Sequence, residues 1–399
     1  MRSIPQTRNL QQLVFVAVIG ALQVSCGGGG GAQFAPAPTY VYSEPAPVNT
    51  LLSFASVGAG NQHSGMLSAS GAAYCWGSNE YGQLGVLVPT QVCSGGSVPC
   101  SPVPLQVAGS LNFVSIDGSV RHTCGLTVAG VAYCWGFGAG GQLGDGLSVN
   151  SQEPVAVAGG LQFSMLDVGI GGLLTCGIAT NARTYCWGPG NQGGLGNGTT
   201  DGATEPAEVA TSLQFISVAA GQDHACGLVS TGDAYCWGRN TFGKLGKGGS
   251  GAELVPALVA GGIPFSAITA GGQHTCALTS GGAAYCWGFG ASLGTGAATD
   301  SNVPVPVGGS QAFASIHAGQ QHTCALTVGG VAYCWGPQFS PIGDGTELAR
   351  SSPVAVAGGL SFRALASGGA ATCGVTTGNV GYCWGDNAYG AVGQPDVAP

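Results

Sequence analysis

Residues 271–296 read GGQHTCALTSGGAAYCWGFGASLGTG, and the rest of the chain is organised around this stretch. Two segments in it, Cys276–Thr279 and Ala283–Trp287, have the pattern of half-buried strands, and the Ser-Gly-Gly between them tolerates the positive φ of a tight turn. In the register that this loop imposes, Cys276 lies opposite Cys286, within reach of a disulfide bond. The stretch therefore predicts a disulfide-linked β-hairpin.

The hairpin belongs to a longer unit that recurs along the chain. Leu293-Gly294 follows a short turn, and a proline-containing extended segment, Val303–Val307, leads to the next unit, so each unit reads as a small antiparallel sheet. Self-similarity of this length in an all-strand chain is typical of radial blades. We therefore predict an all-β, seven-bladed β-propeller of about 50-residue repeats. The Cys-Trp-Gly triplet marks the copies, at intervals of 48 to 59 residues, at Cys75, Cys134, Cys186, Cys236, Cys286, Cys334 and Cys383.

The repeat resembles that of the regulator of chromosome condensation family. The matching pattern is AG-x-x-HTCAL-x(5)-G-x-x-YCWG-x-N-x-x-G-x-LG followed by P-V-x-V, and it covers residues 50–394. The cysteine-rich spelling looks like a bacterial exported branch rather than the eukaryotic nuclear one. The resemblance implies a protein-binding propeller. In the exchange factor that names the family, one face meets the GTPase Ran through side chains that include His and Asp, and an exported propeller of this type inhibits β-lactamases.

The two ends of the chain are expected to meet. The last unit stops at Gly393-Gln-Pro without its proline-containing strand, whereas Glu44–Val48 resembles Glu153–Val157 of a complete unit. We predict that the N-terminal strand completes the seventh blade, so that N- and C-terminal strands close the ring.

Residues 1–26 have the features of a signal peptide. Arg2 and Arg8 precede an apolar core at 13–22, which is too short for a stable membrane span. Cys26, followed by five glycines, resembles a bacterial lipoprotein junction, and we expect it to be lipidated. Gln23 stands where such junctions usually have Leu, so plain cleavage by signal peptidase is the alternative. Residues 27–42 are then a flexible Gly/Ala/Pro tether, and 43–399 the propeller, with an insertion at 86–104 after blade 1.

The charge balance argues against nucleic acid as a partner. The chain has 9 Lys and Arg against 17 Asp and Glu, and loss of the two leader arginines leaves 7 − 17 = −10. So few cations cannot neutralise many phosphates. We expect a monomer that contacts a membrane only through the lipid anchor.

Cysteine spacing predicts seven disulfides. Disulfides at this density persist only in an oxidising compartment, so we expect an exported protein of the cell envelope or the extracellular space. Blade 1 has Gly65 where the other blades have a cysteine, which leaves Cys75 as a free buried thiol; exchange with the insertion's cysteines is the alternative. The expected pairs are Cys124–Cys134, Cys176–Cys186, Cys226–Cys236, Cys276–Cys286, Cys324–Cys334, Cys373–Cys383 and, in the insertion, Cys93–Cys100.

We predict neither a metal site nor a cofactor. Zinc bound by His-x-Cys is the alternative to the disulfides, but the sequence has no Cys-x-x-Cys knuckle, and Leu174 and Ala371 replace the His in two blades. Asp145 and Asp344 stand in Gly-Asp-Gly turns, where Asp usually bonds its own backbone; calcium binding is the alternative there.

Candidate binding residues fall into two groups. Arg121, Arg183, Arg239 and Phe289 interrupt the repeat, and a binding site usually breaks symmetry; neutral loop variation is the alternative. Five histidines share one repeat position and are candidates to line one mouth of the central channel; the alternative is that each caps a turn or hydrogen-bonds a neighbouring blade. They are His63, His122, His224, His274 and His322, and His317 lies outside this set without an assigned role.

Two further features bear on function. The insertion at 86–104, rigidified by its small disulfide loop, is a natural recognition element. The seven tryptophans are expected in the interblade core rather than in a sugar-binding platform, because packing demands strict repetition. They are Trp76, Trp135, Trp187, Trp237, Trp287, Trp335 and Trp384.

The sequence thus predicts an exported, surface- or membrane-anchored scaffold that binds a protein through one propeller face and its loops. It is expected to be non-catalytic, because no nucleophile–base–acid motif stands out. Guanine-nucleotide exchange on a small GTPase, which the family resemblance implies, is the first alternative. A glycan-binding or polysaccharide-active envelope protein is the second.

Overall fold

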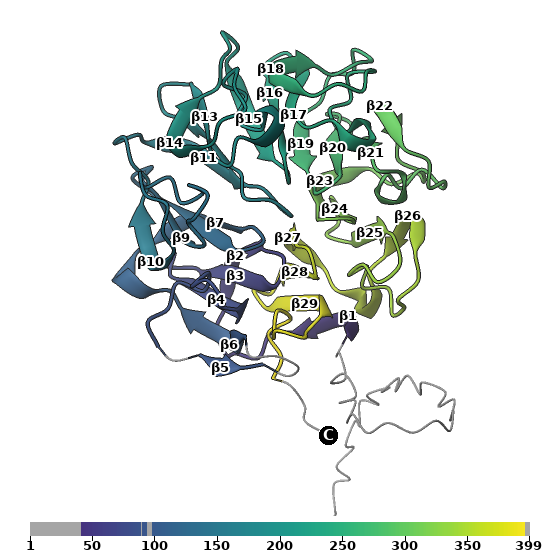
Figure 1. Ribbon diagram of the computed structural model, residues 1–399. Helices are drawn as coiled ribbons and strands as arrows, with labels where there is room; N and C mark the ends of the chain where they lie inside the picture. Colours follow the sequence, from purple (N-terminus) through teal and green to yellow (C-terminus); the bar gives the residue numbers. More distant parts are fainter. Residues whose placement is uncertain (1–40, 89, 94–97, 396–399) are drawn as a thin grey trace, which may run out of the picture. The chain divides into compact units, whose positions relative to one another are not determined.

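The computed structural model describes residues 41–88, 90–93 and 98–395. The leader, Cys26 and residues 27–40 of the expected tether lie outside the described residues. The described chain forms seven antiparallel sheets around one axis, the blades of a β-propeller (Figure 1). The predicted fold class is therefore confirmed. Among the described residues, no helix is long and apolar enough to cross a membrane.

Each blade has four main strands, counted outward from the axis. The first strands, which contact one another around the axis, are β2 (Phe54–Ala59), β7 (Phe113–Gly118), β11 (Phe163–Val168), β15 (Phe215–Ala220), β19 (Ala267–Ala270), β23 (Phe313–Ala318) and β27 (Phe362–Ser367). The second are β3 (His63–Ser68), β8 (His122–Thr127), β12 (Thr175–Ala179), β16 (His224–Val229), β20 (His274–Leu278), β24 (Thr323–Thr327) and β28 (Ala371–Thr376). The third are β4 (Ala73–Ser78), β9 (Ala132–Gly136), β13 (Thr184–Gly188), β17 (Ala234–Gly238), β21 (Ala284–Gly288), β25 (Ala332–Gly336) and β29 (Gly381–Asp386). The fourth, at the rim, are β6 (Pro99–Gln106), β10 (Ser151–Ala156), β14 (Ala203–Glu208), β18 (Glu253–Leu258), β22 (Ser301–Pro306), β26 (Arg350–Ala355) and β1 (Val41–Pro47).

Single-turn 3₁₀ helices lie in several connections. They are η1 (Ala108–Ser110), η2 (Asn191–Gly193), η3 (Thr241–Gly243), η4 (Gly290–Ser292) and η5 (Ala357–Gly359).

The N-terminal strand closes the ring as predicted. β1 pairs antiparallel with β29, so that Ala46 lies opposite Cys383, and the two strands lie side by side in Figure 1. The strand begins at Val41, two residues before the expected start of the propeller, so Val41 and Tyr42 belong to the sheet rather than to the tether. Asn49 then donates a backbone hydrogen bond to Gly393 over 2.9 Å, which joins the two ends of the ring.

The hairpin register is the predicted one, and all seven expected disulfides are present. Cys276 lies opposite Cys286, and the six hairpin disulfides have Cα–Cα distances of 4.0–4.1 Å. In the insertion, Cys93 pairs with Cys100. Cys75 is free and buried opposite Gly65.

The core lies between blades rather than within them. All seven tryptophans have no exposed surface. Trp335 of blade 6, for example, packs with Leu293 and the Cys276–Cys286 disulfide of blade 5. Gly294 is at φ +71°, and a Cβ there would lie 2.6 Å from Trp335 Nε1. The recurring Leu-Gly is thus explained, because only glycine allows this close approach.

The insertion after blade 1 widens the sheet at the rim. It adds β5 (Gln91–Val92) outside β6, so that, within the described residues, only this blade has five strands. Leu87, Val88 and Val92 are 54–62% exposed in it.

Candidate functional site

The propeller has two ends with different connections. Because neighbouring strands are antiparallel, the loops from first to second strands and from third to fourth strands emerge at one end, which we call the loop face. The loops from first to second strands are the inner loops, and those from third to fourth strands are the outer loops. The hairpins between second and third strands, and the connections to the next blade, emerge at the other end, the hairpin face.

The five histidines of the repeat are buried between blades. Each has at most 2% of its surface exposed, so none lines an open mouth. Each ring instead bonds a threonine of the next blade, as in the alternative prediction, and we no longer count the five as partner-binding residues. The Nε2–Oγ1 distances are 2.8 Å for His63–Thr123, 2.9 Å for His122–Thr175, 2.9 Å for His224–Thr275, 2.8 Å for His274–Thr323 and 2.8 Å for His322–Thr372.

The same bond recurs within a larger network, and the boundary between blades 5 and 6 is representative. The hydroxyl of Thr323 donates to the carbonyl oxygen of Ser292 over 3.1 Å, and Trp335 Nε1 donates to the same oxygen over 2.9 Å. Because the hydroxyl proton of Thr323 is donated to Ser292, its oxygen accepts a hydrogen bond from the Nε2–H of His274. The network therefore assigns one tautomer to the ring and ties an outer loop to the following blade.

Burial keeps these rings neutral. Desolvation lowers the pKa of His63 to about 4 and that of His322 to about 3. The pKa of His274 is also lowered to about 3, mainly by desolvation and further by the charges of His322 and Lys244. The rings serve as hydrogen-bond donors and not as proton carriers at neutral pH.

The sequence analysis did not identify two carboxyl groups near the axis, those of Asp117 and Asp167. Asp117 accepts a hydrogen bond from the backbone N–H of Val168 over 3.2 Å, and Asp167 accepts one from Ala220 over 2.6 Å. Each therefore joins its first strand to that of the next blade. Burial raises the pKa of Asp117 to about 7, and burial together with the charge of Asp117 raises the pKa of Asp167 well above its usual value. Variation at the first-strand position that pairs with the hairpin's first cysteine was the signal that could have revealed them.

Within the described part of the chain, no three His, Cys, Asp or Glu side chains are grouped so that they could hold a metal ion. The two turn aspartates bond their own loops. Asp145 accepts from the backbone N–H of Leu147 over 3.0 Å, and Asp344 accepts from that of Thr346 over 3.0 Å. Asp344 also pairs with Arg350 Nε over 2.6 Å.

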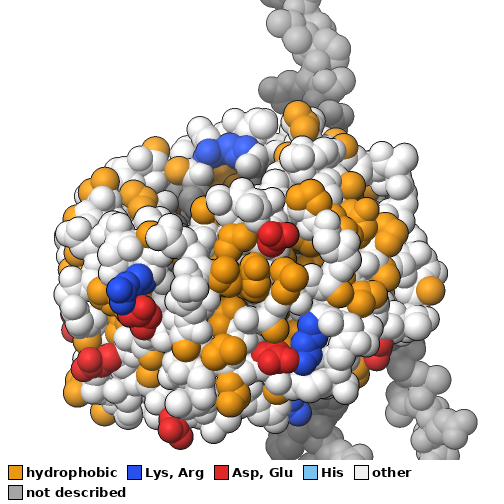
Figure 2. All heavy atoms as spheres, turned by 90° about the horizontal axis from the view of Figure 1, so that it is seen from above, with side chains coloured by type: hydrophobic (Ala, Val, Ile, Leu, Met, Phe, Trp, Pro, Cys, Tyr) orange, Lys and Arg blue, Asp and Glu red, His pale blue; other side chains and the backbone are white. Residues whose placement is uncertain are grey.

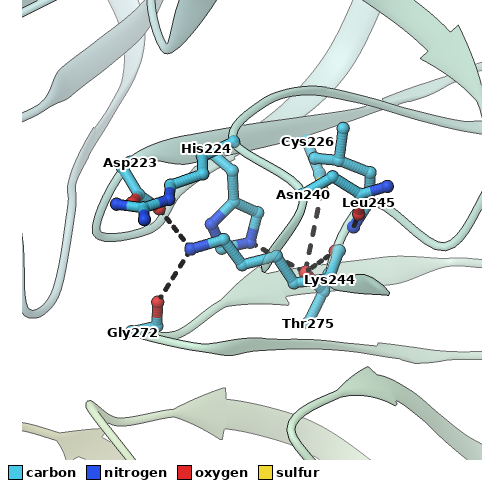
Figure 3. Close-up of polar contacts among 9 residues, drawn as sticks. Asp223, His224, Cys226, Asn240, Lys244, Leu245, Gly272 and Thr275 are labelled. Atoms are coloured by element: carbon cyan, nitrogen blue, oxygen red, sulfur yellow. Dashed lines mark hydrogen bonds and ion pairs between the residues drawn. The ribbon is translucent and has the colours of Figure 1, made fainter. Parts of the chain in front are cut away.

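A buried lysine fixes the loop face at blades 4 and 5. Lys244, in the outer loop of blade 4, has a side chain 2% exposed, and its Nζ pairs with the Asp223 carboxylate and donates to the carbonyl of Gly272 over 3.2 Å (Figure 3). Arg239 Nη1 lies 3.5 Å from the same carboxylate. Burial lowers the pKa of Lys244, and Asp223 opposes that shift. Three loops from two blades are thereby held together.

A second cluster lies on the loop face at blades 1 and 2. The guanidinium carbon of Arg121 is 4.9 Å from the ring centroid of Tyr81 and 5.6 Å from that of Phe137. The two rings meet edge to face at 5.1 Å. Phe242 and Phe289 form a similar pair between blades 4 and 5, with centroids 5.2 Å apart.

The centre of the loop face is also asymmetric. The inner loop of blade 3 has six residues between paired positions 168 and 175, whereas blade 4 has four between 220 and 225. Its extra length carries Gly171 toward the far side of the ring, where a Cβ would lie 3.1 Å from Gln320 Cγ and 3.5 Å from Gly272 Cα. In the sequence, only the replacement of His by Leu174 marked this loop.

The three predicted arginines do not meet at one site. Arg121 and Arg239 lie on the loop face, but Arg183 follows β12 in a hairpin on the opposite face, where it pairs with Glu208 over 2.8 Å. Charged residues make up only 7% of the whole chain. Figure 2 shows one side of the molecule, where they are scattered over a surface of apolar and uncharged polar groups.

Family models match most of the propeller. The regulator of chromosome condensation (RCC1) repeat matches residues 70–126, 129–178, 181–228, 231–278 and 281–326, more than half of the chain, and a second model of the repeat matches 54–83, 215–244 and 265–292. The chain belongs to the RCC1 repeat family. The family resemblance predicted from the sequence is therefore confirmed.

Individual relatives share only part of their length with this RCC1-repeat chain. The Ultraviolet-B receptor UVR8 of Arabidopsis thaliana is 34% identical over 95 residues, 24% of this chain and 20% of the receptor. The probable E3 ubiquitin-protein ligase HERC4 of Rattus norvegicus is 33% identical over 88 residues, 22% of this chain and 8% of the ligase.

Solved structures share the fold at low identity. Human WBSCR16 has a TM-score of 0.73 at 19% identity and covers 86% of this chain and 89% of its own. Yeast RCC1 (Prp20), solved bound to Kap60, has a TM-score of 0.67 at 20% identity and covers 84% and 80%. These likenesses establish the propeller fold.

Proposed function

We propose that this protein is an exported, non-catalytic scaffold that binds a protein partner through its loop face, acting as a monomer. The observation that carries the proposal is that three of the four side chains that interrupt the repeat, Arg121, Arg239 and Phe289, lie on the loop face, and only Arg183 lies on the hairpin face. Arg121 with Tyr81 and Phe137, and Arg239 with Phe242 and Phe289, all belong to inner or outer loops. Aromatic and Arg side chains are the types enriched in interface hot spots.

Export is supported by the disulfides. Six of them lie in hairpins that contribute to the interblade core, so the fold depends on an oxidising compartment. The same point disfavours nucleotide exchange on a cytosolic GTPase. A sugar platform of tryptophans is disfavoured because all seven indoles are buried. Anchoring through Cys26 rests on the sequence alone.

Export and lipid attachment are tested by the intact mass of the protein purified from its native envelope, measured with and without reduction. We expect a chain that begins at Cys26, carries a diacylglyceryl group and contains seven disulfides. A full-length chain with all sixteen cysteines reduced would contradict export.

Binding is tested by affinity for the partner recovered from the same envelope. Replacement of Tyr81 and Phe242 by Ala should weaken binding by about tenfold or more, because hot-spot aromatics dominate interfaces. Replacement of Val128 and Val328, which are 87% and 88% exposed on the hairpin face, should change it less than about twofold. The reverse pattern would place the partner on the hairpin face.

A further inference from the structure

Arg121 differs from every other cation in the described residues. Of the nine Lys and Arg, Arg2 and Arg8 lie outside those residues, which leaves seven. Arg363 donates to the carbonyl of Phe54 over 2.6 Å. Arg121 is exposed and forms no ion pair or side-chain hydrogen bond with any described residue. The carboxylate pairs of the other five are Arg183–Glu208, Arg239–Asp223, Lys244–Asp223, Lys247–Glu253 and Arg350–Asp344.

The guanidinium nevertheless has a fixed place. It lies over Tyr81 from the outer loop of blade 1 and beside Phe137 from the outer loop of blade 2. An aromatic face holds the charge by cation–π attraction. No described carboxylate pairs with the guanidinium, so its N–H groups, which lie in one plane, are free to donate to a ligand.

The backbone on both sides of this cluster is also fixed. Phe137 N donates to the carbonyl of Arg121 over 2.9 Å, and Arg121 N donates to Ser119 Oγ over 3.3 Å. Tyr81 N donates to Gln83 Oε1 over 2.9 Å. Little backbone conformational entropy therefore remains to be lost when a ligand binds here.

The carboxyl group of Glu80 belongs to the same outer loop as Tyr81. The pKa of Tyr81 is raised by partial burial and then by a hydrogen bond with Glu80, while the charge of Arg121 lowers it. Glu80 forms no ion pair with Arg121. The platform thus presents one uncompensated positive charge on a protein with a net charge of −8.

We propose that the Arg121 platform, formed by Arg121, Tyr81 and Phe137, binds a carboxylate of the protein partner. The inference rests on the proposed function and makes it more specific: the partner presents an Asp or Glu side chain at the boundary of blades 1 and 2. A planar guanidinium and a carboxylate form two parallel hydrogen bonds, which gives this contact its specificity.

A phage-displayed library of random dodecapeptides, selected on the full-length protein, tests this proposal. We expect the selected peptides to be enriched in Asp and Glu. The affinity of the leading peptide should fall at least about tenfold when its acidic residue is changed to the amide, and by a similar factor for Arg121→Met, since charge-assisted bonds are lost. Arg121→Lys keeps the positive charge but cannot form the two parallel hydrogen bonds. Its peptide affinity should lie between those of the parent protein and Arg121→Met.

Arg183→Met is the matched control, because it removes the same charge from the hairpin face, and it should leave peptide affinity within about twofold. Melting temperatures of all variants exclude unfolding as the cause. Selected peptides without acidic residues, a library that yields no binder, or equal binding by Arg121→Met would each overturn the proposal. Partner binding that depends on the loop face but not on Arg121 would leave the proposed function standing and refute only this inference.

Discussion

His274 Nε2 lies 2.8 Å from Thr323 Oγ1, and this hydrogen bond crosses the boundary between blades 5 and 6. At two other boundaries the histidine is absent and the threonine position differs as well. Blade 3 has Leu174 at the histidine position, and blade 4 has Ala225 at the threonine position that would face it. Blade 7 has Ala371, and blade 1 has Ser64, whose hydroxyl still donates to the preceding outer loop, at the carbonyl of Ala391 over 2.9 Å. The two positions change together within one chain, as expected for a direct contact.

This coupling predicts a non-additive pair of substitutions. His274→Leu and Thr323→Ala should each lower the free energy of unfolding by roughly 1–3 kcal/mol, because each leaves a buried polar group without its partner. The double variant, which copies the Leu174–Ala225 pair, should lose at least about 0.5 kcal/mol less than the sum. Urea unfolding under non-reducing conditions measures this, and additive losses would show that the bond is not a coupling element.

The buried histidines predict acid sensitivity. The folded pKa values of His63, His274 and His322, about 4, 3 and 3, lie below the unfolded value of 6.5, so the unfolded state binds more protons between those limits. Stability should therefore be full above pH 6.5 and fall as pH is lowered toward 4, by up to roughly 1.4 kcal/mol per pH unit for each ring. Asp117 and Asp167 have raised pKa values and act in the opposite direction, but they are fewer.

Thermal melts between pH 7.5 and 4.5 measure this slope. His274→Leu should make it shallower than in the parent protein, since one titrating ring is gone. A melting temperature that stays constant or rises on acidification would refute the assignment of neutral, desolvated rings.

Gly65→Cys should supply the hairpin disulfide that blade 1 lacks. Position 65 pairs directly with Cys75, and a Cβ at Gly65 would lie 3.3 Å from Cys75 Sγ and 3.1 Å from the flexible end of Ile116. A closed loop of this length should add roughly 2–3 kcal/mol to the free energy of unfolding. Peptide mapping of the thiols and a thermal melt, with Gly65→Ser as control, test it; two unpaired thiols with a lower melting temperature would contradict the prediction.

Deletion of residues 43–49 should open the ring. The segment includes most of β1 and Val48, which is 4% exposed in a core cluster with Trp76 and Cys383. Blade 7 would lose its fourth strand, and the joint between the chain ends would be lost. The melting temperature should fall by roughly ten degrees or more, in proportion to the several kcal/mol of burial removed. An unchanged melt would show that the strand does not hold the ring closed.

The sequence was informative wherever the repeat itself carried the signal. The spacing of Cys276 and Cys286 sets a local hairpin register, and Glu44–Val48 matched a rim strand that the last blade lacked. The candidate site was harder to predict from the sequence because its contacts join different repeats. Tyr81, Arg121 and Phe137 come from three loops, and only Arg121 stood out as a break in the pattern. The histidines looked like candidates to line one mouth of the channel because their threonine partners lie about 50 residues away in the next blade.

Photo-crosslinking from the two faces tests the central claim most directly. A benzoylphenylalanine is placed at Glu80 or Phe242 on the loop face, and at Val128 or Val328 on the hairpin face, and the protein is irradiated in its native envelope. We predict that the loop-face positions crosslink to one discrete protein partner and that the hairpin-face positions do not. Crosslinks formed only from the hairpin face, or from neither face, would contradict a scaffold that binds through its loop face.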